Sequence, residues 1–355
     1  MAYFPRGVVS SVLKSSFTPC KLRFSGRYFL TTRKIFSFFR ASLGCLASFF
    51  PICITFAVLS AVSACDSNSE QQIAKMLEDS EQQLEPEERN FPDDITVEKL
   101  FWGEEPSQYG ELYLPVERDE HLPVVITIHG GCWLSRYDLS YMEDLAIYFA
   151  QHGMAVWNME YRAIGNGGEW PNLFLDVGQA ADYVRYLARE RSLDTARVVS
   201  VGHSAGGHLS LWLLSRKRIP ETSPISRAFP IVLAGAISLG GIPDLRSNAC
   251  SQTSQDILGT ASISPAEQAE RLRATSPMSM LPTGLSSVLI VGAEDRIVEP
   301  VLSERYVSAA AEVGDDSRYF VMDGLGHYGL IDTAYMDMDF LKDQIEALWP
   351  KQSGE

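Results

Sequence analysis

Cysteine, internal repeats and metal-ligand clusters are scarce or absent in this sequence of 355 residues. The six cysteines are too few for the dense disulfide framework that many small secreted domains use. No segment repeats at a fixed period, and His and Cys do not occur at metal-site spacing. The sequence therefore predicts neither a repeat architecture nor a bound metal. The formal net charge of −15 argues against nucleic acid and other polyanions as partners.

Acidic residues are also missing from positions 1–64, although this stretch contains eight basic ones: Arg6, Lys14, Lys21, Arg23, Arg27, Arg33, Lys34 and Arg40. The last of them precede an apolar run, residues 41–65, which ends in small residues and Cys65. This order of basic, apolar and small residues is typical of an export signal. Residues 62–65, VSAC, resemble the lipobox of bacterial lipoproteins. The resemblance implies an exported, membrane-anchored bacterial lipoprotein on the periplasmic side or the cell surface, with Cys65 as the lipidated N-terminus.

Three other interpretations of this segment stay open. The apolar run is long enough for a retained membrane-spanning helix, although Pro51 interrupts it. Residues 1–30 are also consistent with a transit peptide, and a misassigned start codon would make them an upstream extension. Cleavage before Cys65 would leave a more acidic chain in which Cys132 and Cys250 are the unmodified cysteines. These two either form a disulfide or remain buried thiols.

Residues 66–94 contain ten acidic residues against Lys75 and Arg89. Such low hydrophobicity and high charge predict a flexible tether, residues 65–94. A folded domain is expected over residues 95–355. In it, near-continuous apolar runs typical of buried parallel strands alternate with helical periods. The pattern predicts the α/β class, a doubly wound and mostly parallel sheet with helices on both faces. The expected strands are residues 110–116, 123–130, 154–162, 196–202, 231–241, 286–295 and 317–327, and the expected helices are 138–153, 173–192, 205–217, 303–314 and 333–350.

The stretch VVSVGHSAGGH, residues 198–208, places Ser204 between Gly202 and Gly206 at a predicted strand-to-helix turn. Glycines at these two positions allow a turn so tight that side chains would collide with the returning backbone. The turn exposes the serine hydroxyl and places the N–H group of Ala205, at the start of the helix, beside it. We interpret Ser204 as a nucleophile; the alternative is a glycine-rich turn with an incidental serine.

Three further motifs follow predicted strands, and the carboxyl ends of parallel strands meet at one edge of the sheet. HGGCW, residues 129–133, closes the strand VVITI, and its glycines let the N–H groups of Gly131 and Cys132 share a cavity with that of Ala205. Asp295 follows SSVLIV, and His327 follows RYFVM.

Together these motifs resemble the α/β-hydrolase fold enzymes, in particular the esterase and lipase branch with an HGG-type oxyanion loop. The resemblance covers about residues 108–349. Within this branch, the chain is most similar to the feruloyl-esterase-like and kynurenine-formamidase-like groups, because it contains HGGxW, EYR at 160–162, Trp170-Pro171 before Asp176, and GHSAGG. The resemblance implies the chain order serine, acid, histidine. It therefore implies a triad of Ser204, Asp295 and His327. One departure concerns the oxyanion loop, where this chain has Cys132 in place of a third glycine.

The other histidines and carboxylates fit these roles less well. Only His327 follows a strand-end carboxylate. His203 lies in the elbow and is expected to project away from Ser204, so it lines the pocket at best, together with Trp133 and Tyr328. Glu294, Asp323 and Asp332 are rivals of Asp295. Packing, structural or solvated roles are expected for His208, His129, His121 and His152.

We therefore expect a serine hydrolase that cleaves a small carboxylic ester through an acyl-enzyme, with no cofactor. An amide hydrolase of the arylformamidase or exopeptidase kind is the alternative, and a non-catalytic binding lipoprotein is a third reading. The expected partners are a small-molecule ester or amide substrate and, through the lipid anchor, a membrane. Residues 244–281 are either a partial cap over the site or a surface excursion with one helix, residues 264–274.

Overall fold

The computed structural model describes residues 89–117, 121–247 and 249–350. The predicted export signal, Cys65 and the predicted tether as far as residue 88 lie outside them. Within the described ranges, no helix is long and apolar enough to cross a membrane.

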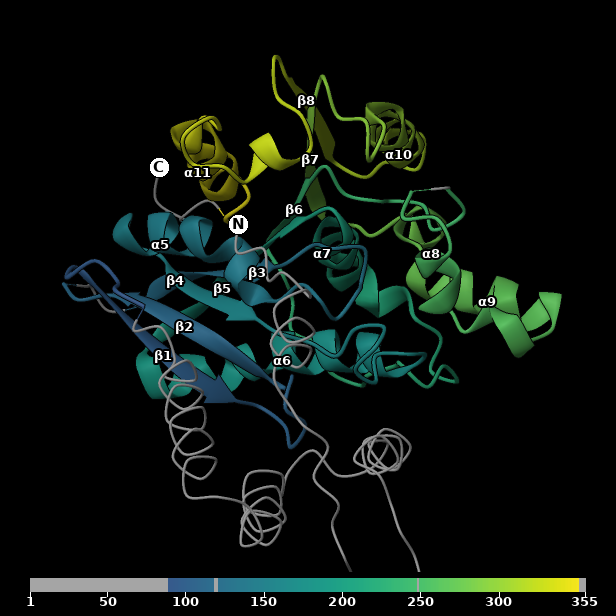
Figure 1. Ribbon diagram of the computed structural model, residues 1–355, viewed down its shortest axis with the longest axis horizontal. Helices are drawn as coiled ribbons and strands as arrows, with labels where there is room; N and C mark the ends of the chain where they lie inside the picture. Colours follow the sequence, from purple (N-terminus) through teal and green to yellow (C-terminus); the bar gives the residue numbers. More distant parts are fainter. Residues whose placement is uncertain (1–88, 118–120, 248, 351–355) are drawn as a thin grey trace, which may run out of the picture. The chain divides into compact units, whose positions relative to one another are not determined.

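An eight-stranded sheet forms the centre of the fold, in the order β1-β2-β4-β3-β5-β6-β7-β8 (Figure 1). The strands β1 and β2 are antiparallel to each other, and β2 is antiparallel to β4. The remaining neighbours, in the order β4-β3-β5-β6-β7-β8, are all parallel. The predicted α/β class and mostly parallel sheet are therefore confirmed. The strands are β1 Ile95–Phe101, β2 Tyr109–Pro115, β3 Leu122–Ile128, β4 Ala155–Met159, β5 Leu193–His203, β6 Gly235–Leu239, β7 Ser286–Gly292 and β8 Ser317–Met322.

Helices cover both faces of the sheet (Figure 1). The helices α6 (Asn172–Arg191), α7 (Ala205–Ser215) and α10 (Pro300–Glu312) pack on one face, and α5 (Glu143–Gln151) and α11 (Met338–Glu346) pack on the other. Alternate residues of β3 enter the two cores, with Ile126 and Ile128 on the α7 side and Val125 on the α5 side. This burial on both faces explains why the central strands read as continuous apolar runs.

The edge strand β1 was missing from the predicted elements. Its sequence, ITVEKLF, is mostly exposed and carries Glu98 and Lys99 in its middle. Charged side chains are a common device on edge strands, because they discourage pairing with another chain. They also remove the apolar periodicity by which a buried strand is recognised.

Residues 240–285 connect β6 to β7 and contain more structure than the one helix expected. They form α8 (Thr253–Asp256), α9 (Pro265–Thr275) and two 3₁₀ turns, η3 (Thr260–Ser262) and η4 (Pro277–Met280). The α9 helix begins at a Ser264 cap, whose hydroxyl accepts the N–H of Glu267 at 3.2 Å. The segment is tied to α7, since Trp212 Nε1 donates to the Ala274 carbonyl at 2.9 Å. Its apolar side chains join the core on that face: Leu245, Ile257, Leu258 and Ala274.

Candidate active site

The predicted serine elbow lies between β5 and α7. Ser204 has φ +56° and ψ −119°, a conformation that costs a non-glycine residue about 1–3 kcal/mol and is retained only where the surroundings impose it. Its backbone N–H donates to the Leu239 carbonyl at 2.8 Å. A Cβ at Gly202 would overlap the carbonyl oxygen of Gly206, so the close approach across the turn requires glycine. The sequence thus forms this turn for the reason expected.

Asp295 and His327 follow β7 and β8 and meet at this edge of the sheet. Nδ1 of His327 lies 2.7 Å from Oδ2 of Asp295, and both side chains are buried. The other carboxylate oxygen of Asp295 accepts the N–H groups of Ile297 and Val298, each at 2.9 Å. Burial raises the pKa of Asp295, but the bonds from His327 and the two N–H groups outweigh it and hold that pKa below its usual value. An ionised Asp295 fixes the proton of His327 on Nδ1 and leaves Nε2 free to accept one.

Sequence reasoning missed a glycine behind this pair. Gly240, just after β6, has φ +52°, and a Cβ there would lie 3.2 Å from both Asp295 Oδ2 and His327 Nδ1. The position therefore needs glycine both for its backbone angle and for space. A strand-end GG pair, residues 240–241, was the available signal.

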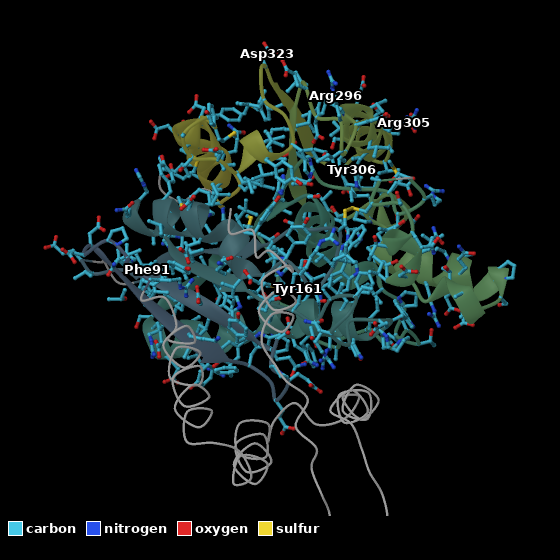
Figure 2. The ribbon with its side chains drawn as sticks, viewed as in Figure 1. Phe91, Tyr161, Arg296, Arg305, Tyr306 and Asp323 are labelled. Atoms are coloured by element: carbon cyan, nitrogen blue, oxygen red, sulfur yellow. A yellow bond between two sulfur atoms is a disulfide. The ribbon has the colours of Figure 1, made fainter. Side chains whose placement is uncertain are left out.

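The rival carboxylates do not reach the histidine. Glu294, Asp323 and Asp332 are exposed, and none of them is hydrogen-bonded to His327 among the described residues. Asp323 lies at the tip of the turn after β8 (Figure 2). Only Asp295 among the four candidates has the geometry to orient the imidazole.

The HGGCW loop passes directly beside the serine. A Cβ at Gly130 would lie 3.1 Å from Ser204 Cβ. The loop begins at His129, whose Nε2 is 3.1 Å from Glu160 Oε1 and whose ring stacks on Tyr161 at 4.3 Å. In the described part of the chain, the N–H groups of Gly131, Cys132 and Ala205 have no protein acceptor. Unpaired N–H groups beside a nucleophile are what an oxyanion hole requires.

Two of the three expected pocket residues are placed differently from the prediction. Trp133 is completely buried and packs edge-on against His208 at 5.3 Å, so it belongs to the core rather than to a pocket wall. His203 is also completely buried. Tyr328 is 55% exposed, and its ring centroid is 5.5 Å from that of His327.

His203 contacts the proposed base, His327, which the sequence analysis did not anticipate. Its Nε2–H donates to the His327 carbonyl at 2.9 Å, and the two rings are 4.5 Å apart. Burial, and then the neighbouring His327, lower the pKa of His203 to about 3. Burial likewise lowers the pKa of His208 to about 4, although its Nε2 is hydrogen-bonded to the Thr275 carbonyl. Both rings are therefore neutral near pH 7, and sequence alone could not place the His203 ring because the elbow's backbone angles decide its direction.

Two further tyrosines, absent from the sequence-based candidates, complete a tyrosine rim of Tyr137, Tyr141 and Tyr328. The ring of Tyr137 packs directly on Gly131 of the HGGCW loop, and its centroid is 6.1 Å from that of Tyr141. The ring centroids of Tyr141 and Tyr328 are 6.5 Å apart. Burial and the two neighbouring tyrosines raise the pKa of Tyr141, so its hydroxyl stays protonated. The rim runs from the oxyanion loop to the base.

The open question about the two cysteines has a structural answer. Cys132 and Cys250 form a disulfide with Cα atoms 5.4 Å apart, across a sequence separation of 118 residues. It joins the HGGCW loop to the segment between β6 and β7.

Known structures share this fold at low sequence identity. A truncated carbohydrate esterase from gut microbiota superposes with a TM-score of 0.59 and 18% identity, over 73% of this chain and 99% of that one. Esterase B from Lactobacillus rhamnosis, inhibited by a tributyrin phosphonate, gives a TM-score of 0.61 and 18% identity over 80% and 96% of the two chains. These likenesses confirm the α/β-hydrolase fold.

Sequence relatives point in the same direction. A probable isoprenylcysteine alpha-carbonyl methylesterase of Oryza sativa subsp. japonica is 25% identical over 242 residues, 65% of this chain and 56% of the relative. The Arabidopsis thaliana isoprenylcysteine alpha-carbonyl methylesterase is 26% identical over 122 residues, 34% of this chain and 28% of the relative. The chain thus spans little more than half of the rice protein and under a third of the Arabidopsis one. The BD-FAE family matches residues 111–309. Because this match spans more than half of the sequence, the chain belongs to the BD-FAE family, an esterase family of the α/β-hydrolase fold.

Proposed function

We propose that this protein is a serine esterase that cleaves a small carboxylic ester in two steps. The Ser204 hydroxyl attacks the ester carbonyl while Nε2 of His327 takes its proton. The N–H groups of Gly131, Cys132 and Ala205 stabilise the negative charge on the carbonyl oxygen. His327 then gives the proton to the departing alcohol, which leaves an acyl group on Ser204. Water activated by the same histidine releases the acid and restores the serine.

The observation that carries this proposal is the 2.7 Å contact between Asp295 and His327, buried at the strand edge that also presents the Ser204 elbow. A carboxylate in this position stabilises the imidazolium formed during each proton transfer. The names of the relatives, a methylesterase and a carbohydrate esterase, support ester rather than amide bonds as the substrate.

The choice between an ester and an amide substrate is tested by assaying the purified full-length chain. The substrates are p-nitrophenyl esters of graded acyl length, aryl esters and N-formylkynurenine. We expect the rate of ester hydrolysis to rise as the acyl chain shortens. The Ser204→Ala variant should lose this activity. Faster hydrolysis of N-formylkynurenine than of every ester would assign the same residues to an amide hydrolase. No turnover of any substrate by a folded chain would favour the binding lipoprotein.

The proposed location rests on residues 1–65 alone. We expect the mature chain to begin at an acylated Cys65 and to fractionate with membranes, because two acyl chains already suffice for stable anchoring. Mass spectrometry of the mature N-terminus and fractionation of cells that express the wild type or Cys65→Ser check this. An intact Met1 in the mature protein, or a fully soluble wild type, would rule out the lipoprotein.

A further inference from the structure

The disulfide joins two backbone segments that both have unusual conformations. At one end, Cys132 and Trp133 have φ +53° and +56°. At the other, Cys250 and Ser251 have φ +60° and +49°. Non-glycine residues seldom adopt positive φ, and bulky ones such as Trp133 least of all. Two consecutive residues of this kind at each end of one covalent bond indicate that the bond and the packing around it impose the conformation.

In the part of the chain that the structure describes, the backbone of Cys132 makes no hydrogen bond. Its neighbours are held, since the Gly131 carbonyl accepts the N–H of Leu134 at 3.0 Å and the Trp133 carbonyl accepts that of Ile164 at 2.8 Å. Among the hydrogen bonds of the described residues, none involves the N–H or carbonyl group of Cys132. The disulfide is therefore the interaction that fixes this residue directly, and its N–H is one of the three that we assign to the oxyanion hole.

The opposite end is firmly anchored. The Cys250 carbonyl accepts both the N–H and the hydroxyl of Thr253, at 3.1 and 2.8 Å. One turn later, Ile257 and Leu258 are completely buried in the core around α7. A bond to Cys250 therefore links Cys132 to the packed interior.

We propose that Cys250 is a positioning residue for the oxyanion hole, which makes the rate of hydrolysis depend on the oxidised state of the Cys132–Cys250 pair. The inference rests on the proposed function. Through the disulfide, Cys250 holds Cys132 at a positive φ, which directs the Cys132 N–H toward the oxygen of the tetrahedral intermediate. In an HGGG loop, the third glycine adopts a positive φ freely. The present chain has Cys132 at that position, and the disulfide to Cys250 holds it at a positive φ instead.

The redox step is an exchange with a dithiol. Two electrons and two protons pass from the dithiol to the protein, the Cys132–Cys250 bond breaks, two thiols form, and the dithiol closes to its own disulfide. Without the bond, Cys132 is free to relax to a negative φ. Its N–H then turns away, while Ser204, Asp295 and His327 stay in place.

The test compares the oxidised full-length wild type, the same protein after dithiothreitol, and Cys250→Ala, which leaves the HGGCW loop chemically intact. We expect kcat on a p-nitrophenyl ester to fall by about 10- to 100-fold in the last two. This is less than the roughly 100- to 1,000-fold cost of deleting an oxyanion donor, because the donor is displaced and not removed. KM should change by less than about 3-fold, as expected for an interaction made mainly in the transition state. Fluorophosphonate labelling of Ser204 should slow in parallel.

Two controls isolate the bond. Cys250→Ala should be insensitive to dithiothreitol, which excludes effects through the other cysteines of the chain. Ser264→Ala weakens the cap of α9 in the same segment and should lower the melting temperature while kcat stays unchanged. Oxidation of the reduced wild type should restore kcat.

The inference is overturned if Cys250→Ala melts at a lower temperature but keeps the wild-type kcat, since the disulfide then serves only stability. Thiol alkylation that finds Cys132 and Cys250 reduced in fully active enzyme overturns it as well. If Cys250→Ala fails to fold, the reduced wild type decides alone. Failure of the proposed function looks different, because the oxidised wild type would then neither cleave an ester nor be labelled at Ser204.

Discussion

The Ser204→Ala variant is expected to lose ester turnover and covalent labelling by a fluorophosphonate together, while its melting temperature stays near that of the wild type. Phosphonylation reproduces the tetrahedral intermediate, so it needs the nucleophile, the base and the oxyanion donors at once. Loss of the serine in comparable triads lowers kcat by about 10⁶-fold. Among the described residues, the Ser204 hydroxyl makes no hydrogen bond that caps α7, and alanine meets the same strain at φ +56° as serine does. Stability should therefore change little.

Mass spectrometry of the labelled wild type checks this prediction by locating the adduct. Ser303→Ala is a matched control, since this α10 serine is buried and its hydroxyl has no partner in the described structure. That variant should be labelled at the wild-type rate. An adduct on another serine, or a folded chain that several probes leave unmodified, would show that Ser204 is not the nucleophile.

The second large effect concerns the base and its carboxylate. We expect His327→Ala to lower kcat by about 10⁶-fold and Asp295→Asn by about 10⁴-fold, because the asparagine amide stabilises the wrong imidazole tautomer. His208→Ala is the matched histidine control. It removes a buried ring and the bond to Thr275, so it should lower the free energy of unfolding by about 2–4 kcal/mol yet leave a folded enzyme with measurable turnover.

Steady-state kinetics and urea unfolding of the three variants separate these effects. Inactivation by His208→Ala together with activity in His327→Ala would reverse the assignment of the base.

The Asp295 carboxylate also makes the stability of the fold depend on pH. Since the pKa of Asp295 is lower in the folded chain than its ordinary value, its contribution to stability is present above the ordinary carboxyl pKa. It is lost as the pH falls through the lowered one.

The sequence was most informative where burial or backbone geometry left few choices. Runs such as VVITI and SSVLIV are strands because both faces are covered, and Gly202 and Gly206 are glycines because the elbow has no room for side chains. Strand-end placement and the order of motifs along the chain favoured Asp295 over Glu294, Asp323 and Asp332, and the structure places Asp295 against His327.

Features that depend on tertiary packing could not be predicted from the sequence. The strand β1 has charges where a buried strand has apolar residues. The pairing of Cys132 with Cys250 spans 118 residues, and nothing local to either cysteine specifies its partner. The ring directions of His203 and Trp133 follow from backbone angles at the elbow and the loop, which the amino-acid types at those positions do not fix.

The position of His327 after β8 has a consequence for how the enzyme is made. The HGGCW loop and the serine elbow follow β3 and β5, in the middle of the sheet, whereas β8 is an edge strand and the last of the sheet along the chain. Domains begin to fold while they emerge from the ribosome, N-terminal parts first. A nascent chain that has passed residue 250 contains the proposed nucleophile, Ser204, and the three proposed oxyanion donors, but it lacks the proposed base, His327. If the proposed roles hold, such a chain cannot turn over esters during its synthesis, and hydrolytic competence arrives only with the final strand.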